Sequence, residues 1–484
     1  MTTDATPVPP ELPVDWVREQ FPALEGSGIL FDNAGGSAPL GRVADLVSEY
    51  MRRWPVQLGA SYAESAEASE RLSFARQEIA GILEASSSAS PTADEIVIGA
   101  STSSLLSRLA RSLAPSLGAG DEIIVTDVDH EANITPWRRL AASGVNVLTW
   151  NLNADSQRLE PEDPRKLLSD RTRLVCFTHA SNILGETTPV ARITRLAHDY
   201  GARVVVDGVA YAPHRPMDVR RWEVDFYAFS LYKVYGPHCA VLYVRRPEME
   251  SLANLNHQFM DGSHGPGKLE PGAFPYELLY GAGGVPDYLR ELSGQVTGDR
   301  ESSSLEPAYA AIGTHEERLS SRLLSFLSSE PAVRIVGDER PGPARLPTIS
   351  FVVDGCRSSE IPVRLDPHPG RGYDLGGMDR ADPAGCRGHG GAIRHLHRPH
   401  RPPLRRTGHE HGRHPHRRRR QLYGRHSWVP GLCRATQQLA RRWHHPLGGV
   451  AGRRQPDQLH RLADQRRPGD VHDGQLAGRP HGPG

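Results

Sequence analysis

Lysine is the residue type that first suggests chemistry in this sequence, because it is so scarce. The 484 residues contain only Lys166, Lys233 and Lys268, whereas arginine fills most other positively charged positions. Unlike arginine, a desolvated lysine can lose its proton and attack a carbonyl carbon. Lys233 lies in the aromatic, mostly uncharged run VDFYAFSLYKVYGPH (residues 224–238), which makes it the candidate for covalent chemistry. The alternative is a half-buried lysine whose amine reaches solvent.

One cofactor that uses such a lysine is pyridoxal phosphate, which forms a Schiff base with the amine. Its ring accepts electrons best when an anionic carboxylate keeps the pyridine nitrogen protonated. Asp207 ends the apolar run ARVVVD and precedes Gly208, so its carboxylate should lie at the carboxyl end of a strand. An Asp in this position also caps the next helix in many unrelated folds, so both interpretations stay open.

Further polar residues follow other predicted strands. Thr102 and Ser103, in ASTSS, come between the strand EIVIG and a helix, where backbone N–H groups and hydroxyls could bind a phosphate. They could equally be plain N-caps. His130 follows the strand DEIIVTD and could lie over a cofactor ring, or be a surface histidine. Asn182, in HASNILGETTPV, could donate to the phenolic oxygen of the ring or form an Asx turn.

The elements that must position these residues alternate between strand and helix from about residue 30 to residue 245. Short β-branched runs are separated by helix-period segments such as residues 189–201, where four apolar residues share a face and Gly201 is a good stop. This pattern predicts an α/β fold with a mostly parallel sheet covered on both faces. Ligands of such sheets bind at the carboxyl ends of the strands.

The order of these stretches resembles the class V aminotransferase-like enzymes of fold type I, close to the cysteine desulfurases and selenocysteine lyases. The matching stretches are FDNAGGS, THASNILGETTPV, VVVDGVAYAPH and DFYAFSLYKVYGPH. They cover about residues 30–245 well, and the resemblance continues more faintly to about residue 362. It implies a pyridoxal phosphate enzyme that acts on a small amino acid and forms a homodimer with its sites at the subunit interface.

The resemblance also implies a role for each candidate residue. The residue matching Lys233 forms the Schiff base and moves protons, that matching Asp207 pairs with the pyridine nitrogen, and that matching His130 stacks on the ring. Lys233 and His130 are therefore the expected catalytic residues, and Asn182 is expected near the cofactor oxygen. The phosphate is expected to bind Thr102, Ser103 and Ser230.

Several positions depart from the usual desulfurase pattern. Ala210 replaces a glutamine that touches the cofactor, Tyr232 replaces a phosphate-binding histidine, and Ala273 replaces a threonine that reaches the partner's phosphate. Desulfuration also needs a thiolate on a loop of the C-terminal region. The stretch RTGHEHG (residues 406–412) has no cysteine, and the surroundings of Cys433 do not match.

The remaining cysteines do not change this expectation. Cys239 and Cys356 are expected to be packing residues. A related lyase, racemase or transferase of a branch without the catalytic cysteine is therefore preferred. A true cysteine desulfurase and a catalytically silent protein that binds pyridoxal phosphate are the alternatives.

The predicted organisation has four parts. Residues 1–29 form an N-terminal arm, residues 30–300 the large cofactor-binding domain, and residues 301–365 the start of a smaller α+β domain that is incomplete. Residues 366–484 are rich in Arg, His, Gly and Pro and have almost no apolar periodicity with which to build a core. This tail is expected to be disordered, or to be the translation of a GC-rich gene in the wrong frame.

Charge and composition exclude some classes of protein. The tail has 23 Arg and no Lys against 8 Asp and one Glu, a net charge of +14, so residues 1–365 carry −14. A basic tail could bind nucleic acid, but a frameshift explains its abrupt start better. No metal site is expected, because HLHRPH lacks a second ligand pair. With no signal peptide and no long apolar run, the protein is expected to be cytoplasmic.

Overall fold

The computed structural model of the chain describes most of the predicted large domain. The described residues are 10–25, 33–84, 90–259, 265–358 and 360–361. The predicted tail, residues 366–484, lies outside them, so its interpretation stays a prediction.

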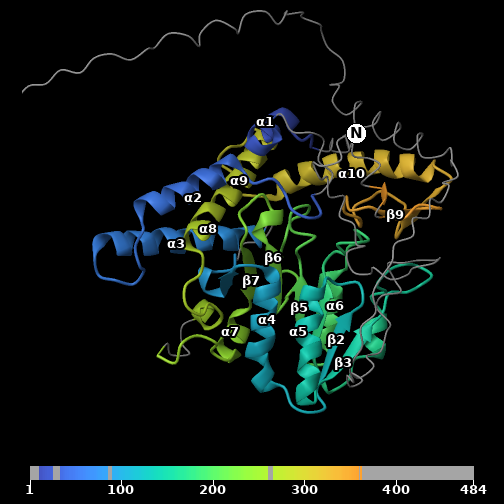
Figure 1. The fold of residues 1–484 in the computed structure, drawn as a ribbon, viewed down its shortest axis with the longest axis horizontal. Coiled ribbons are helices and arrows are strands. Elements are labelled where there is room, and N and C mark those ends of the chain that lie inside the picture. Colours follow the sequence, from blue (N-terminus) through green and yellow to red (C-terminus); the bar gives the residue numbers. More distant parts are fainter. Residues whose placement is uncertain (1–9, 26–32, 85–89, 260–264, 359, 362–484) are drawn as a thin grey trace, which may run out of the picture. The chain divides into compact units, whose positions relative to one another are not determined.

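A seven-stranded sheet of order β1-β7-β6-β5-β4-β2-β3 forms the centre of the described chain (Figure 1). Four neighbouring pairs are parallel, and β7 is antiparallel to both of its neighbours. The predicted α/β fold with a mostly parallel sheet is confirmed. The strands are β1 Ile96–Gly99, β2 Glu122–Thr126, β3 Asn146–Trp150, β4 Thr172–Thr178, β5 Arg203–Asp207, β6 Phe226–Ser230 and β7 Ala240–Val244.

Alternate residues of each inner strand enter two different apolar layers. In β6, Phe226 and Ala228 join one buried cluster, whereas Tyr227 and Phe229 join the other. All five residues of this strand are buried. Burial on both faces explains why the segment before Lys233 reads as a continuous apolar run, since neither face can carry a charge without loss of solvation.

Helices supply the outer layers of the sheet. Leu105 and Leu109 of α4 belong to one apolar cluster, and Val190 and Ile193 of α6 belong to the other, so these two helices cover opposite faces. The predicted buried face of α6 is confirmed. The α-helices are α1 Val14–Glu19, α2 Gly41–Arg53, α3 Ala63–Ile82, α4 Thr102–Leu113, α5 Thr135–Arg138, α6 Val190–His198, α7 Arg246–Ser251, α8 Tyr276–Ala282, α9 Gly284–Thr297 and α10 Glu306–Ser328.

The chain continues from α10 into a two-stranded antiparallel sheet of β8 (Val333–Val336) and β9 (Ser350–Val353). Leu324, Leu327 and Ile335 form a small buried cluster between the helix and this sheet. α10 and β9 lie where the sequence predicts a helix and a strand, and β8 is an addition, while the division into a large and a smaller α+β domain stays a prediction. No helix in the described ranges is long and apolar enough to cross a membrane.

A buried carboxylate ties α6 to the strand that precedes Lys233. Asp225 is fully buried and accepts hydrogen bonds from the backbone N–H of Val204 at 2.8 Å and from His198 Nε2 at 2.9 Å. Arg245 Nη2 lies 2.6 Å from the same carboxylate. The hydrogen bond with Asp225 outweighs partial burial and raises the pKa of His198.

We expect the substitution His198→Gln to cost more stability at about pH 6 than at about pH 9. A raised pKa in the folded state means that the charged imidazole favours folding. This contribution is complete below the unfolded pKa of about 6.5 and is lost as the pH rises through the higher folded value. Thermal unfolding midpoints of the wild type and the variant at both pH values measure it. His315→Gln is the control, because burial lowers the pKa of His315 and its pH trend should be opposite.

Candidate active site

The ends of the parallel strands bring the predicted site residues together. Asp207 is the last residue of β5 and Ser230 the last residue of β6. In the register of the sheet Asp207 pairs with Ala228 on one side and with Thr178 of β4 on the other. Lys233 follows directly in a short 3-10 helix, η7 (Leu231–Lys233). The aspartate and the lysine therefore belong to neighbouring strand ends.

Two buried hydroxyls lie at the N-terminus of α4. Thr102 Oγ1 is 2.7 Å from Ser230 Oγ, and both residues are buried. The N-cap of this helix is Ser101, whose side chain accepts from the backbone N–H of Ser104 at 3.2 Å. Thr102 is therefore not the capping residue, and its hydroxyl is directed to β6. Ser103, predicted beside it, is exposed.

The lysine loop is held by the segment after residue 33. Lys233 Nζ donates to the carbonyl oxygen of Ala34 at 2.6 Å. The backbone N–H and the hydroxyl of Ser37 both donate to the carbonyl of Tyr232, at 3.1 and 3.0 Å. Tyr235 has a φ of +61°, an unfavourable value for an aromatic residue, and its N–H donates to Ser37 Oγ at 2.9 Å. These bonds fix the start and the end of the loop.

The other two lysines have structural surroundings. Lys166 is exposed and pairs with Asp163 at 2.6 Å. Lys268 is buried, and its amine donates to the carbonyls of Met249 and Glu250, both at 2.9 Å, at the end of α7. Scarcity alone therefore did not distinguish Lys233, whereas its place at the strand ends does.

The carboxylate of Asp207 is surrounded by groups that stabilise a negative charge. Burial raises the pKa of Asp207. The backbone N–H of Val209, which donates to Oδ1 at 2.9 Å, and the electrostatic interactions with His130 and Lys233 lower this pKa. The three predicted residues Asp207, His130 and Lys233 therefore share one electrostatic environment.

His130 and Asn182 lie in turns that leave part of each side chain accessible. His130 is exposed at the start of the 3-10 helix η4 (Glu131–Asn133), where Nδ1 accepts from the backbone N–H of Ala132 at 3.1 Å. Asn182 is half-buried. The turn around it is held by Ser181 Oγ, which accepts from the backbone N–H of Leu184 at 3.1 Å. The alternative interpretation placed an Asx turn at Asn182, whereas the hydrogen bond described in this turn is made by Ser181.

The sequence profile of the aminotransferase class-V family matches residues 29–370. The chain belongs to this family. Aminotransferase-like protein FGM3 of Gibberella zeae is 40% identical over 356 residues, which are 72% of this chain and 84% of the relative. Cysteine desulfurase-like protein ustD of Aspergillus flavus is 32% identical over 373 residues, 75% and 80% of the two chains. The crystal structure of the cysteine desulfurase CsdA from Escherichia coli is similar, with a TM-score of 0.60 and 26% identity over 72% of this chain and 85% of that chain.

The class V aminotransferase family is dependent on pyridoxal phosphate, and the side chains at this sheet edge fit that cofactor. Two buried hydroxyls at a helix N-terminus suit a phosphate dianion. A buried carboxylate at the end of β5 suits a protonated pyridine nitrogen. A lysine amine in the adjacent loop suits the aldehyde. Thr102, Ser230, Asp207 and Lys233 could therefore hold it.

Two residues beside the site were not found from the sequence. Asp129, next to His130, is buried and bonded to the end of β4. His179 is also buried, stacks on Tyr211 with ring centroids 3.4 Å apart, and is bonded through Nδ1 to the Tyr227 hydroxyl at 2.9 Å. The Tyr227 hydroxyl also explains Gly208, because a Cβ there would lie 2.2 Å from it. The signal for both residues was their position just beyond an apolar strand, since His179 follows β4 directly and Asp129 lies three residues after the end of β2.

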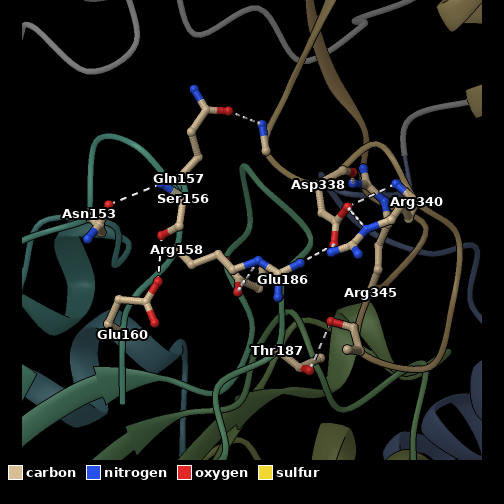
Figure 2. A network of polar contacts seen from close by, with 12 residues as sticks. Asn153, Ser156, Gln157, Arg158, Glu160, Glu186, Thr187, Asp338, Arg340 and Arg345 are labelled. Atoms are coloured by element: carbon tan, nitrogen blue, oxygen red, sulfur yellow. Dashed lines mark hydrogen bonds and ion pairs between the residues drawn. The ribbon is translucent and has the colours of Figure 1, made fainter. Parts of the chain in front are cut away.

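A polar network joins residues 153–160 and the residues Glu186 and Thr187 to the segment after β8 (Figure 2). Arg158 Nε lies 3.4 Å from Glu186 Oε1, and another nitrogen of the same guanidinium binds Asp338. Glu186 also forms an isolated β-bridge with Arg345. Burial raises the pKa of Glu186 to about 7, and the attraction of Arg158 offsets this only in part.

We expect the substitution Glu186→Gln to stabilise the protein at about pH 8.5 relative to wild type, and to lose this advantage at about pH 5. A carboxyl whose folded pKa is raised favours folding when it is protonated. Its contribution is complete below the unfolded value and is lost as the pH rises through the folded value of about 7. Unfolding midpoints at both pH values measure the difference. An equal shift at both would contradict the role of Glu186 ionisation.

Proposed function

We propose that the chain is a pyridoxal phosphate-dependent enzyme that acts on a small amino acid, with Lys233 as the residue that binds the cofactor covalently. The observation that carries this proposal is the meeting of three groups at one edge of the sheet. They are the lysine amine, the buried carboxylate of Asp207 and the hydroxyl pair of Thr102 and Ser230.

The residues have separate tasks in this proposal. Pyridoxal phosphate, when bound, supplies an electron sink for bonds at the α carbon of an amino acid. The carboxylate of Asp207 holds a proton on the pyridine nitrogen, and Thr102 and Ser230 donate hydroxyl hydrogens to the phosphate. His130 covers one face of the ring. The Lys233 amine would hold the cofactor and, when free, could take a proton from the α carbon of the substrate and return it.

The described cysteines favour a lyase, racemase or transferase over a desulfurase in the strict sense. Cys176 and Cys239 are buried, and burial raises the pKa of Cys239 to about 12. Neither can supply a thiolate at neutral pH. Cys356 is half-buried in the turn after β9, where its thiol donates to the carbonyl of Arg357 at 3.5 Å. A persulfide on any cysteine after incubation with L-cysteine would reverse this preference.

We expect the wild type to develop a yellow absorption band with added pyridoxal phosphate, and Lys233→Ala to develop none. The band reports the covalent bond between the cofactor and a lysine amine. After reduction with borohydride, the mass of the adduct should be found on the peptide that contains Lys233. Lys166→Ala is the matched control, because Lys166 is exposed and its amine pairs with Asp163, away from the strand ends of the site. An adduct that persists in Lys233→Ala would disprove the assignment.

We expect Ser230→Ala to weaken the binding of pyridoxal phosphate by about tenfold, because a hydrogen bond to a charged group contributes about 1.5 kcal/mol. Titration of the absorption band measures the affinity. Binding of pyridoxal, which lacks the phosphate, should be unchanged. Ser116→Ala is the matched control, because Ser116 is exposed in the short 3-10 helix η3 (Ala114–Ser116) that follows α4. An equal loss of affinity for pyridoxal phosphate and pyridoxal would show that Ser230 stabilises the fold of the site and does not bind the phosphate.

A further inference from the structure

Asp129 is a buried carboxyl group to which no role has been given so far. It follows β2 and accepts three hydrogen bonds from three different elements. The Thr126 hydroxyl belongs to the last residue of β2, and Asn133 Nδ2, at 2.9 Å, belongs to η4. The third donor, at 2.9 Å, is the backbone N–H of Thr178. Thr178 is the last residue of β4.

These bonds determine where the next residue, His130, is held. Asn133 is fixed in turn, because its Oδ1 accepts from Trp137 Nε1 at 3.1 Å and its backbone N–H donates to the carbonyl of His130 at 2.9 Å. The His130 backbone is thus enclosed between Asp129 and Asn133. Because Thr178 is the register partner of Asp207, the same contact places this loop beside the buried aspartate.

We propose that Asp129 is a positioning residue of the active site, which holds the loop of His130 against the end of β4 so that the imidazole stays over the cofactor ring next to Asp207. The inference rests on the proposed function, since it concerns the same site. It adds a residue that does not itself touch the cofactor. Its effect must therefore be transmitted through His130.

The charges around Asp129 are consistent with this role. Burial and then the repulsion from Asp207 raise the pKa of Asp129 to about 8. Cys176 of β4 is a second titratable group that interacts with Asp129. It is also buried, and burial raises the pKa of the Cys176 thiol well above its ordinary range. As a neutral acid, Asp129 would donate to the Thr126 hydroxyl and still accept from Asn133 Nδ2 and the Thr178 N–H, without adding a second negative charge next to Asp207.

A double-mutant cycle on the full chain tests whether Asp129 acts through His130. We expect Asp129→Ala and His130→Ala each to weaken the binding of pyridoxal phosphate by roughly tenfold, and the double variant to weaken it by the same factor. Both single variants should also lose most of the visible circular dichroism of the bound cofactor, because the ring is no longer held at a fixed angle. Far-ultraviolet circular dichroism establishes that each variant is folded.

The alternative outcomes are distinct. If the double variant loses roughly a hundredfold, the two effects are additive and Asp129 does not act through His130. If Asp129→Ala does not fold, Asp129→Leu takes its place in the cycle, since it keeps about the same volume but offers no acceptor to the Thr178 N–H, and additivity would again overturn the proposal. Asp127→Ala, in the same loop but bonded to Leu152 N, should leave the affinity unchanged. A wild type that forms no absorption band would overturn the proposed function as well.

Discussion

The burial of the Asp207 carboxylate is the constraint on which the architecture of the site depends. A buried charge is unfavourable unless hydrogen bonds and opposite charges compensate for it. Here the compensation comes from the Val209 N–H and from two side chains that lie on other strand ends, His130 and Lys233. The parallel register of β4, β5 and β6 is what brings these ends within reach. Local sequence alone could not supply this compensation.

The backbone around this edge of the sheet is also constrained in its conformation and in the side chains that it can carry. Gly208 leaves no room for a side chain, because the Tyr227 hydroxyl occupies that space and is bonded to His179. On the other side of the lysine, Tyr235 adopts a left-handed conformation that is unfavourable for its type. Its bonds to Ser37 and the packing of its ring against Phe21 offset this cost. The lysine loop is therefore held by residues far away in the sequence.

Much of this arrangement could be predicted from the sequence because it depends on strand ends. Apolar runs that stop at a polar residue predicted Asp207, and the structure places it at the end of β5. The phosphate hydroxyls were harder, since helix starts are rich in Ser and Thr. Sequence could not tell that Ser101 caps α4, that Thr102 reaches Ser230, and that Ser103 is exposed. The polar contacts of the Asn182 turn with the segment after β8 depend on tertiary packing and gave no local signal.

Asp129 shows most clearly what a local pattern leaves out. Its type and position resemble those of any aspartate after a strand, and its neighbour His130 attracts attention first. Its character follows from its surroundings, because it is buried, Thr178 donates to it and Asp207 repels it. Two neighbouring carboxyl groups thus have different surroundings. A lysine and a histidine attract the Asp207 carboxylate, whereas Asp129 is repelled by Asp207 and held by three hydrogen bonds. This division requires the folded sheet, since only the register of β4 and β5 brings the two groups together.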